Sequence, residues 1–255
     1  MSLHPETSTL ANLEPSQAGQ RGSLSVTDCS TVRPRALDLF CCAGGAGMGL
    51  HRAGFDVHGV DIEPQPNYPF AFTQGDALAQ DLTGCDFVWA SPPCQKHTAI
   101  NHGKKGELAC FIAATRAKLK AWGGPYIIEN VPGAPLENPV MLCGSMFDLG
   151  VLRHRLFESN VALRAPGPCA HKGNVADGTY VSVHGGGQRS THKIPYAQQR
   201  PRWEAAMGVT WTGTRHELCQ AIPPAYSFFL GRQIIQTLTP GQSNDAHQPT
   251  RRTDV

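Results

Sequence analysis

The chain has 255 residues, of which 40% are hydrophobic, and its formal net charge is +2 at pH 7. This length and apolar content suffice for one α/β domain, and no run of about 18 apolar residues is present to span a membrane. The nine cysteines are an odd number and include no Cys-x-x-Cys pair, which favours a reduced, intracellular protein.

The elements predicted along the chain alternate between strands and helices. Residues 1–34 and 240–255 are polar and predict disordered tails, and we expect no secretory leader. Apolar runs predict strands at residues 36–40, 57–61, 87–91 and 126–130, with helices ending near residue 53 and covering 107–122. This alternation predicts a doubly wound, mostly parallel α/β sheet, in which ligands bind at the carboxyl ends of the strands.

A glycine-rich turn follows the first strand, over residues 38–49. Closely spaced glycines let a ligand approach the backbone. Asp61, which ends the second strand, is placed to accept hydrogen bonds from ribose hydroxyls, and Asp76 could accept one from an adenine amino group. The glycines do not follow Gly-x-Gly-x-x-Gly, which favours a nucleoside cofactor over a dinucleotide. An ordinary tight turn with a surface Asp is the alternative.

The third predicted strand delivers Ser91-Pro92-Pro93-Cys94-Gln95. The two prolines fix the backbone, so Cys94 is a candidate nucleophile, and a buried structural cysteine is the alternative. The stretch at 96–106 is basic and contains glycines, which suits either a loop closing over phosphates or a flexible surface loop. Glu129 ends the fourth strand and could hold a pyrimidine edge beside Cys94, or be a buried Glu satisfied by a partner.

Four motifs in this order resemble those of the DNA (cytosine-5) methyltransferase family. They are residues 38–49, Pro92-Pro93-Cys94-Gln95, Glu129-Asn130-Val131 and Arg153-His154-Arg155-Leu156-Phe157. Residues 137–158 and 217–231 resemble its phage-encoded members in particular. The resemblance spans residues 36–231 and implies a Rossmann-like methyltransferase sheet with a small target-recognition insertion.

The resemblance also implies roles for individual residues. The residues expected to hold S-adenosylmethionine are Phe40, Ala43, Gly44, Gly45, Gly47, Gly49, Asp61, Ile62, Asp76 and Pro92. Cys94 would add to C6 of cytosine while Glu129 holds N3 and the amino group. Arg155, together with Arg153, would bind the base's O2 and steady Glu129.

Double-stranded DNA is the substrate that the resemblance implies, with the target base flipped out of the helix. The candidate DNA contacts are Gln95, Lys96, Lys104, Lys105 and Arg189. Between residues 151 and 205, eight Arg or Lys stand against three Asp or Glu, a net of +5, which would attract phosphates or form a solvated basic face. We expect a monomer in the cytoplasm of a bacterial or phage-infected cell, with no membrane partner.

The domain organisation expected between the two tails has three parts. Residues 35–158 would form the cofactor-binding and catalytic domain, 159–199 a short target-recognition region, and 200–239 a return to the catalytic domain. The chain departs from the family at Cys42, where Gly is usual, at Val151, where Gln is frequent, and at 219–222, Cys-Gln-Ala-Ile in place of a Gly-Asn-Ser-Val type of element. A modified sulfonium donor therefore stays open.

Three other functions fit parts of the sequence. An RNA methyltransferase would share cofactor and nucleophile, a binding module would keep the fold without turnover, and a cysteine hydrolase would pair Cys94 with His97 or His102. Cys169 with His171, His184 and His192 could be considered for zinc, but no ligand-pair spacing supports a site, so we expect no metal.

Overall fold

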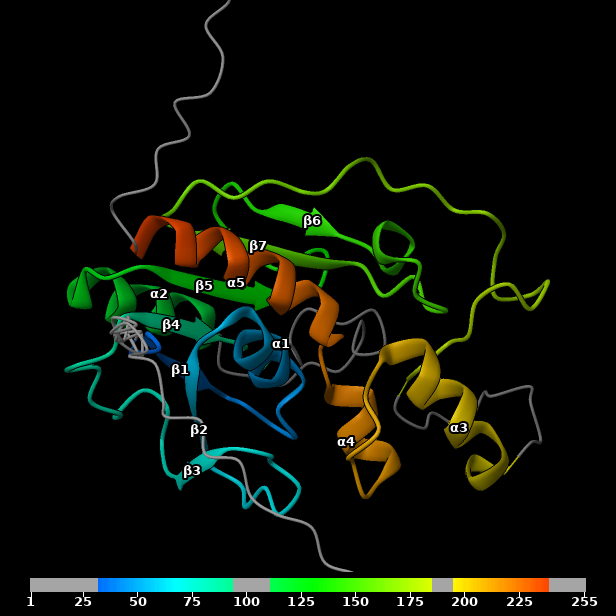
Figure 1. Cartoon of the computed structure of the whole chain (residues 1–255), viewed down its shortest axis with the longest axis horizontal. Coiled ribbons are helices and arrows are strands. Elements are labelled where there is room, and N and C mark those ends of the chain that lie inside the picture. The colour runs from blue at the N-terminus through cyan, green and yellow to red at the C-terminus, as the bar shows by residue number, and fades with distance from the viewer. Residues whose placement is uncertain (1–31, 94–110, 185–194, 239–255) are drawn as a thin grey trace, which may run out of the picture. The chain divides into compact units, whose positions relative to one another are not determined.

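The computed structural model describes residues 32–93, 111–184 and 195–238 (Figure 1). All of its helices and strands lie in the unit Arg33–Val255. The strands are β1 (Arg35–Leu39), β2 (Asp56–Asp61), β3 (Ala71–Gln74), β4 (Phe87–Ala90), β5 (Tyr126–Asn130), β6 (Val140–Leu142) and β7 (Arg155–Ser159). The helices are α1 (Gly45–Ala53), α2 (Phe111–Trp122), the 3-10 turn η2 (Gly144–Phe147), α3 (Tyr196–Met207), α4 (Arg215–Gln220) and α5 (Pro224–Leu238).

The seven strands form one sheet in the order β3-β2-β1-β4-β5-β7-β6. The pairs from β3 to β5 are parallel, and β7 runs antiparallel to both of its neighbours. From β1 the chain adds β2 and β3 on one side, and it then adds β4 and β5 on the other side of β1. The order of strands therefore switches between β1 and β4, and doubly wound sheets bind ligands at the carboxyl ends of the strands at such a switch point.

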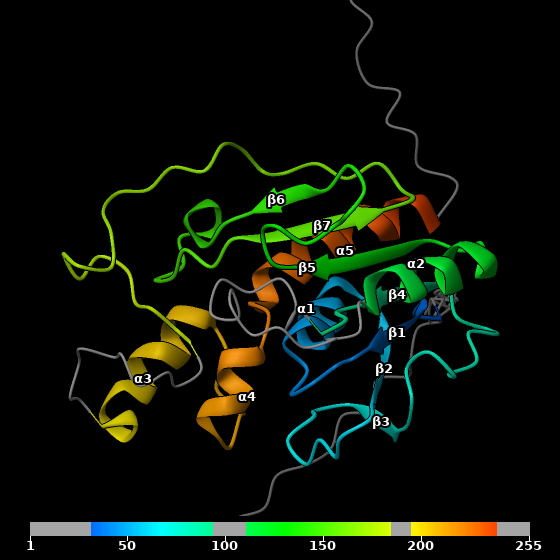
Figure 2. The same cartoon turned by 180° about the vertical axis from the view of Figure 1, so that it is seen from behind.

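Helices cover both faces of the sheet. α1 and α5 lie together on the face toward the viewer in Figure 1, and α2 lies on the face toward the viewer in Figure 2. The buried apolar residues form a cluster on each of these faces. Leu50 of α1 and Leu230 of α5 are fully buried in one cluster, and Leu119 of α2 is fully buried in the other. Because β1, β4 and β5 are covered on both sides, they consist almost entirely of buried residues.

The predicted fold class is confirmed, and so are the four predicted strands, with ends shifted by at most one residue. The helix predicted for 107–122 is described from Phe111 onward. Strands β3, β6 and β7 and helices α3, α4 and α5 were not predicted individually.

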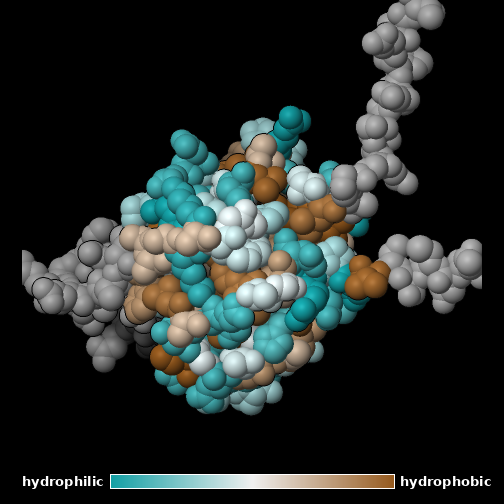
Figure 3. Space-filling view, turned by 90° about the vertical axis from the view of Figure 1, so that its left-hand side faces the viewer, coloured by the Kyte–Doolittle hydropathy of each residue, from teal (hydrophilic) through white to brown (hydrophobic). Residues whose placement is uncertain are grey.

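No helix among the described ranges combines the length and the apolar content that a bilayer crossing requires. On the face shown in Figure 3, apolar residues are broken up by polar ones. The proposed division into domains stays a prediction.

Candidate active site

A cavity of about 690 Å³ opens at the carboxyl ends of β1, β2, β4 and β5. Segments that follow each of these strands line it, and α4 with residues 221 and 222 closes another side. The predicted site residues among its lining are Phe40, Gly45, Asp61, Ile62, Pro92, Glu129 and Arg155.

The turn after β1 has an uncommon backbone conformation. Phe40 (φ 57°), Cys42 (φ 44°) and Gly44 (φ 80°) all have positive φ, which side chains other than hydrogen disfavour. The backbone N–H of Cys42 donates to Asp61 Oδ2 at 2.9 Å, which ties the turn to the end of β2. The family resemblance places a glycine at the position of Cys42. Its positive φ gives a physical reason why glycine would suit that position.

Only one glycine of the turn borders the cavity. A Cβ on Gly45 would collide with the backbone of Ile222, so the missing side chain allows α1 to begin against that segment. A Cβ on Gly47 would lie 2.8 Å from the Tyr68 hydroxyl, and one on Gly49 would collide with Ser227 of α5. These two glycines therefore serve packing between elements.

Ala43 and Gly44 also lie behind the lining. The Ala43 carbonyl accepts a hydrogen bond from Trp211 Nε1 at 2.7 Å. A Cβ on Gly44 would lie 2.9 Å from Tyr68 and Pro69. Both residues hold the turn against neighbouring segments.

The two carboxylates expected at a nucleoside lie in different surroundings. Asp61 is buried at the cavity, where its second oxygen, Oδ1, accepts from the Glu63 N–H at 3.0 Å. Asp76 is exposed and caps a turn by accepting from the Leu78 N–H at 2.8 Å, and it is not among the lining residues.

Asp38 is a buried carboxyl group that the sequence did not single out as a site residue. It lines the cavity with no exposed surface, and Tyr68 donates to its Oδ2 at 3.3 Å. Its Oδ1 has no hydrogen-bond partner. Burial raises the pKa of this carboxyl well above its usual value, with Tyr68 opposing the rise.

The ends of β4 and β5 are joined by a side chain. Asn130, which is 1% exposed, donates from Nδ2 to the Pro92 carbonyl at 2.9 Å. Trp89 Nε1 donates to the Ser91 hydroxyl at 2.9 Å. Both bonds fix the segment that precedes Cys94 in the chain.

Glu129 and Arg155 form a buried ion pair on the cavity wall. Arg155 Nε lies 3.0 Å from Glu129 Oε1, and their side chains are 17% and 7% exposed. The contact lacks hydrogen-bond geometry, so Glu129 Oε1 keeps an unfilled acceptor site. Burial raises the pKa of Glu129 despite the opposing charges of Arg155 and Arg153 and a hydrogen bond from Ser91.

Arg153, which is partly buried, makes different contacts. It has φ 32° and donates to the carbonyls of Val183 and Cys219 at 3.2 and 2.6 Å. Burial lowers its pKa to about 9. Its side chain is not among the cavity residues, and its two hydrogen bonds join the backbone at residue 183 to the backbone at residue 219.

Several predicted residues lie outside the described ranges: Cys94, Gln95, Lys96, Lys104, Lys105 and Arg189. Among the remaining basic residues of 151–205, Arg200 pairs with Glu204 and Arg202 donates to the Gly178 carbonyl. Arg153 and Arg155 also contact groups of the protein itself. These four of the eight basic residues counted in the sequence therefore interact within the protein.

Sequence reasoning missed the contribution of α4. Thr214, Glu217 and Gln220 line the cavity, and Thr214 and Glu217 form a capping box. Glu217 also accepts from Asn67 Nδ2 at 3.0 Å, across 150 residues of sequence. The Thr-x-x-Glu pattern could have predicted the start of the helix, but not its position at the cavity.

Comparisons with known proteins bear on the fold. Neither the family models nor the curated proteins contain a match. Among solved structures, the S. pombe Dnmt2 methyltransferase matches with TM-score 0.54 and 14% identity, covering 81% of this chain and 99% of that one. The Entamoeba histolytica methyltransferase EhMeth matches with TM-score 0.50 and 10% identity, with the same coverage of 81% and 99%.

A third match is a protein described as a candidate DNA modification methyltransferase encoded within an E. coli prophage. It is 20% identical over 49% of this chain, with TM-score 0.37, and this chain spans 45% of its length. At the level of fold, the chain is therefore similar to the Rossmann-like methyltransferases Dnmt2 and EhMeth.

Proposed function

We propose that the chain is a DNA cytosine-5 methyltransferase that uses S-adenosylmethionine. The observation that carries the proposal is the Glu129–Arg155 pair, which faces the same cavity as the turn after β1 and Pro92-Pro93. Cys94 is the next residue of the chain after Pro93. A carboxyl group, a guanidinium and a thiol are the groups needed to activate a pyrimidine ring.

The cavity lining supports a nucleoside donor with an amino acid tail. Asp61 at the end of β2 would accept hydrogen bonds from ribose hydroxyls, and Phe40 and Ile62 would offer apolar contact. The unpartnered Asp38 Oδ1 is an acceptor for a donor group on the ligand. When bound there, S-adenosylmethionine would supply an electrophilic methyl group.

In the proposed mechanism, the residues of the chain make the cytosine ring reactive. The Cys94 thiolate forms a bond to C6 and the C5=C6 π electrons move into the ring toward N3, which takes a proton from the Glu129 carboxyl group. The raised pKa of Glu129 keeps a proton available for this step. C5 is then electron-rich and bonds to the methyl carbon, whose bond to the donor's sulfonium sulfur breaks, and N3 returns its proton to the Glu129 carboxylate. A base that the sequence does not identify removes the C5 proton, and the sulfur leaves as the double bond re-forms.

Arg155 would orient the base. Its guanidinium, 3.0 Å from Glu129, holds that carboxyl group in place and can direct its remaining N–H groups to the base's O2. Because the reacting carbons are stacked inside a duplex, the base must be flipped out, at a cost of a few kcal/mol. The basic residues after Cys94 and the proposed target-recognition region 159–199 would offset that cost.

Covalent trapping with 5-fluorocytosine tests the proposal. Fluorine at C5 cannot leave as a proton does, so wild-type protein with S-adenosylmethionine should form a stable adduct with such DNA, visible as a shifted band on a denaturing gel. Cys94→Ser should form none, and Cys85→Ser, which changes a half-buried cysteine outside the cavity lining, should trap like wild type. Equal trapping by Cys94→Ser would refute the nucleophile assignment.

The alternative substrate is RNA, because the same cavity groups would serve a cytosine from either polymer. Parallel assays with labelled donor on duplex DNA, single-stranded DNA and RNA separate these cases. We expect methyl transfer to DNA. Transfer to RNA alone would leave the chemistry standing and replace the substrate.

A further inference from the structure

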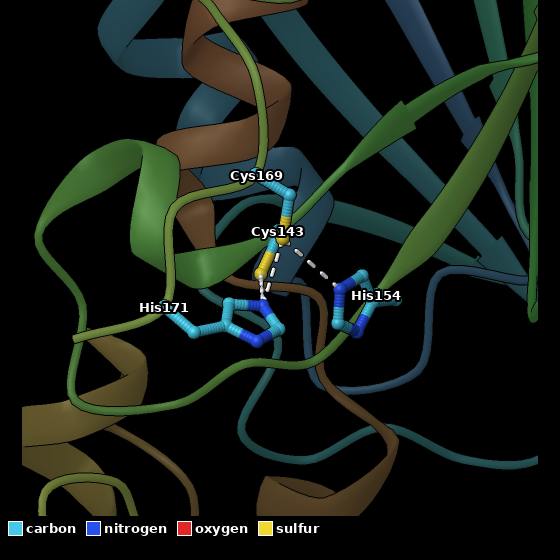
Figure 4. A group of neighbouring side chains, drawn as sticks. All are labelled: Cys143, His154, Cys169 and His171. Carbon is cyan, nitrogen blue, oxygen red and sulfur yellow. Dashed lines mark hydrogen bonds between the residues drawn. The ribbon is translucent and has the colours of Figure 1, made fainter. Parts of the chain in front are cut away.

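A second group of reactive side chains lies outside the cavity. The ligand atoms of Cys143, His154, Cys169 and His171 all lie within 4.8 Å of one another (Figure 4). None of these residues lines the cavity described above. We propose that this cluster is a structural zinc site, with two thiolates and two imidazoles as its four ligands.

The sheet brings the first two ligands together. β6 and β7 pair antiparallel with Leu142, the last residue of β6, opposite Arg155, the first residue of β7. Cys143 directly follows β6, and His154 directly precedes β7. Continuation of an antiparallel pair by one step places such residues opposite each other. The sequence separates these two ligands by ten residues, which hid them from a search for short ligand pairs.

The other two ligands come from one extended segment. Cys169 and His171 are two residues apart, a spacing that puts side chains on the same side of an extended chain. Figure 4 shows both imidazole rings turned toward the two sulfur atoms. His184, considered with Cys169 and His171 from the sequence, instead packs its ring near Trp203, and His192 lies outside the described residues.

The distances suit a tetrahedral ion. Metal bonds of about 2.0–2.3 Å at tetrahedral angles place neighbouring ligand atoms about 3.3–3.8 Å apart. Cys143 Sγ lies 3.4 Å from His171 Nε2, and Cys169 Sγ lies 3.3 Å from His154 Nε2. The Cys169 Sγ to His171 Nε2 distance of 2.7 Å would open by about 1 Å on binding.

The donor set selects the metal. Two soft sulfurs and two imidazole nitrogens, with no carboxylate among them, favour zinc over magnesium or calcium. Each thiol loses one proton to solvent when the ion binds, so two thiolates neutralise the charge of Zn²⁺. Four protein ligands leave no open position, which indicates a structural ion. Ser145 Oγ lies 3.3 Å from Cys143 Sγ and 3.8 Å from Cys169 Sγ, as a supporting contact to both.

The segment that supplies Cys169 and His171 has little regular structure and little apolar burial. Residues 160–184 are all described and contain neither helix nor strand, and Tyr180 is the one residue there that is buried. Apolar burial alone gives such a segment little stability, and a metal crosslink is a common substitute. The site would join this segment to β6 and to His154, whose neighbour Arg155 pairs with Glu129.

Metal content of the purified full-length chain tests the inference independently of methyl transfer. After dialysis against metal-free buffer with a non-chelating reductant, we expect about one zinc ion per chain, measured by inductively coupled plasma mass spectrometry. Cys169→Ser and His171→Ala should lose most of it, and Cys85→Ser and His58→Ala should keep it. Zinc retained by both ligand variants would overturn the assignment.

Cobalt provides a readout that does not depend on variants folding. Wild-type protein loaded with Co²⁺ alone should show the thiolate charge-transfer band and the intense visible bands of tetrahedral cobalt. Binding of neither Co²⁺ nor Zn²⁺ by wild type would refute the site, and an intact mass showing a Cys143–Cys169 disulfide in fresh protein would replace it with a covalent link. Failure here would leave the 5-fluorocytosine result unaffected.

Discussion

The Glu129–Arg155 pair combines two opposing effects within one contact. Burial disfavours the charged carboxylate, and the neighbouring guanidinium favours it. The outcome is a raised pKa, so the group keeps a proton to higher pH than an exposed glutamate does. Arg155 therefore sets how much of Glu129 is protonated, in addition to any contact with a base.

Arg155→Ala should destabilise the protein by roughly 3 kcal/mol at pH 8, the lower end for a broken buried pair, since Arg155 is 17% exposed. The loss should shrink at pH 4, where Glu129 is neutral in both proteins and no unpaired charge is buried. Denaturant unfolding at the two pH values measures this. Arg52→Ala, an exposed arginine on α1, is the control, and a pH-independent loss would contradict the account.

Asp38 gives a second pH dependence, with a sign set by its raised pKa. The folded state holds the proton more tightly than the unfolded state, so the stability contributed by this carboxyl is full below about pH 4 and falls as pH rises through the folded pKa. Asp38→Asn cannot ionise. We expect the free energy of unfolding of wild type to fall relative to Asp38→Asn between pH 4 and 8, and a constant difference would refute the claim.

At the scale of elements, the position of α1 depends on two glycines, one at its start and one in its middle, whose missing side chains allow close contacts. Gly45 lets its first turn meet residue 222, and Gly49 lets its middle meet α5 at Ser227 and Pro224. The orientation of α1 thus depends on close backbone contact with a segment nearly 180 residues later in the chain.

Gly49→Ala should lower stability by about 1–3 kcal/mol, because the added methyl group overpacks the α1–α5 contact. Helix propensity alone would predict a gain of about 1 kcal/mol for this change, so the sign separates the two effects. Thermal or denaturant unfolding decides between them. Gly167→Ala, where a Cβ meets nothing within 4 Å, should be close to neutral.

The strands that could be predicted from sequence were those with continuous apolar runs. Parallel strands covered on both faces, such as β4 and β5, produce that pattern directly. β3 has no buried residue and β6 has only three residues. Neither strand therefore shows an apolar run or an alternation of apolar and polar residues that would predict it from sequence. The turn after β1 could be predicted because it follows a strand directly, and Glu129 because it comes directly after the apolar run of β5.

Other site features depend on contacts that no local pattern encodes. Asp38 sits inside the first strand, where its carboxyl group becomes unusual only through burial beside Tyr68. Gly47 and Gly49 matched a ligand-binding turn in spacing, and the structure shows that packing explains them. Cys143 and His154 become neighbours only once β6 pairs with β7.

For the molecule as a whole, ligand binding and turnover should be separable. S-adenosylhomocysteine at about 100 times its Kd should stabilise wild type and Cys94→Ser alike, by about 2.7 kcal/mol, because it binds the folded state alone. Asp61→Ala should show a much smaller gain, since it removes the carboxylate at the end of β2. Thermal unfolding with and without the ligand measures this. Absence of any shift in wild type would refute the cofactor proposal.

The contact between Gly45 and Ile222 also has a consequence for how the protein is made. A ribosome synthesises the turn after β1 well before residue 222, with more than 170 residues in between. Until residue 222 has been added, the cavity lacks one of its walls. We infer that a nascent chain cannot form the complete cavity before α4 and residue 222 have left the ribosome, and that a premature stop before α4 yields a product with an incomplete site.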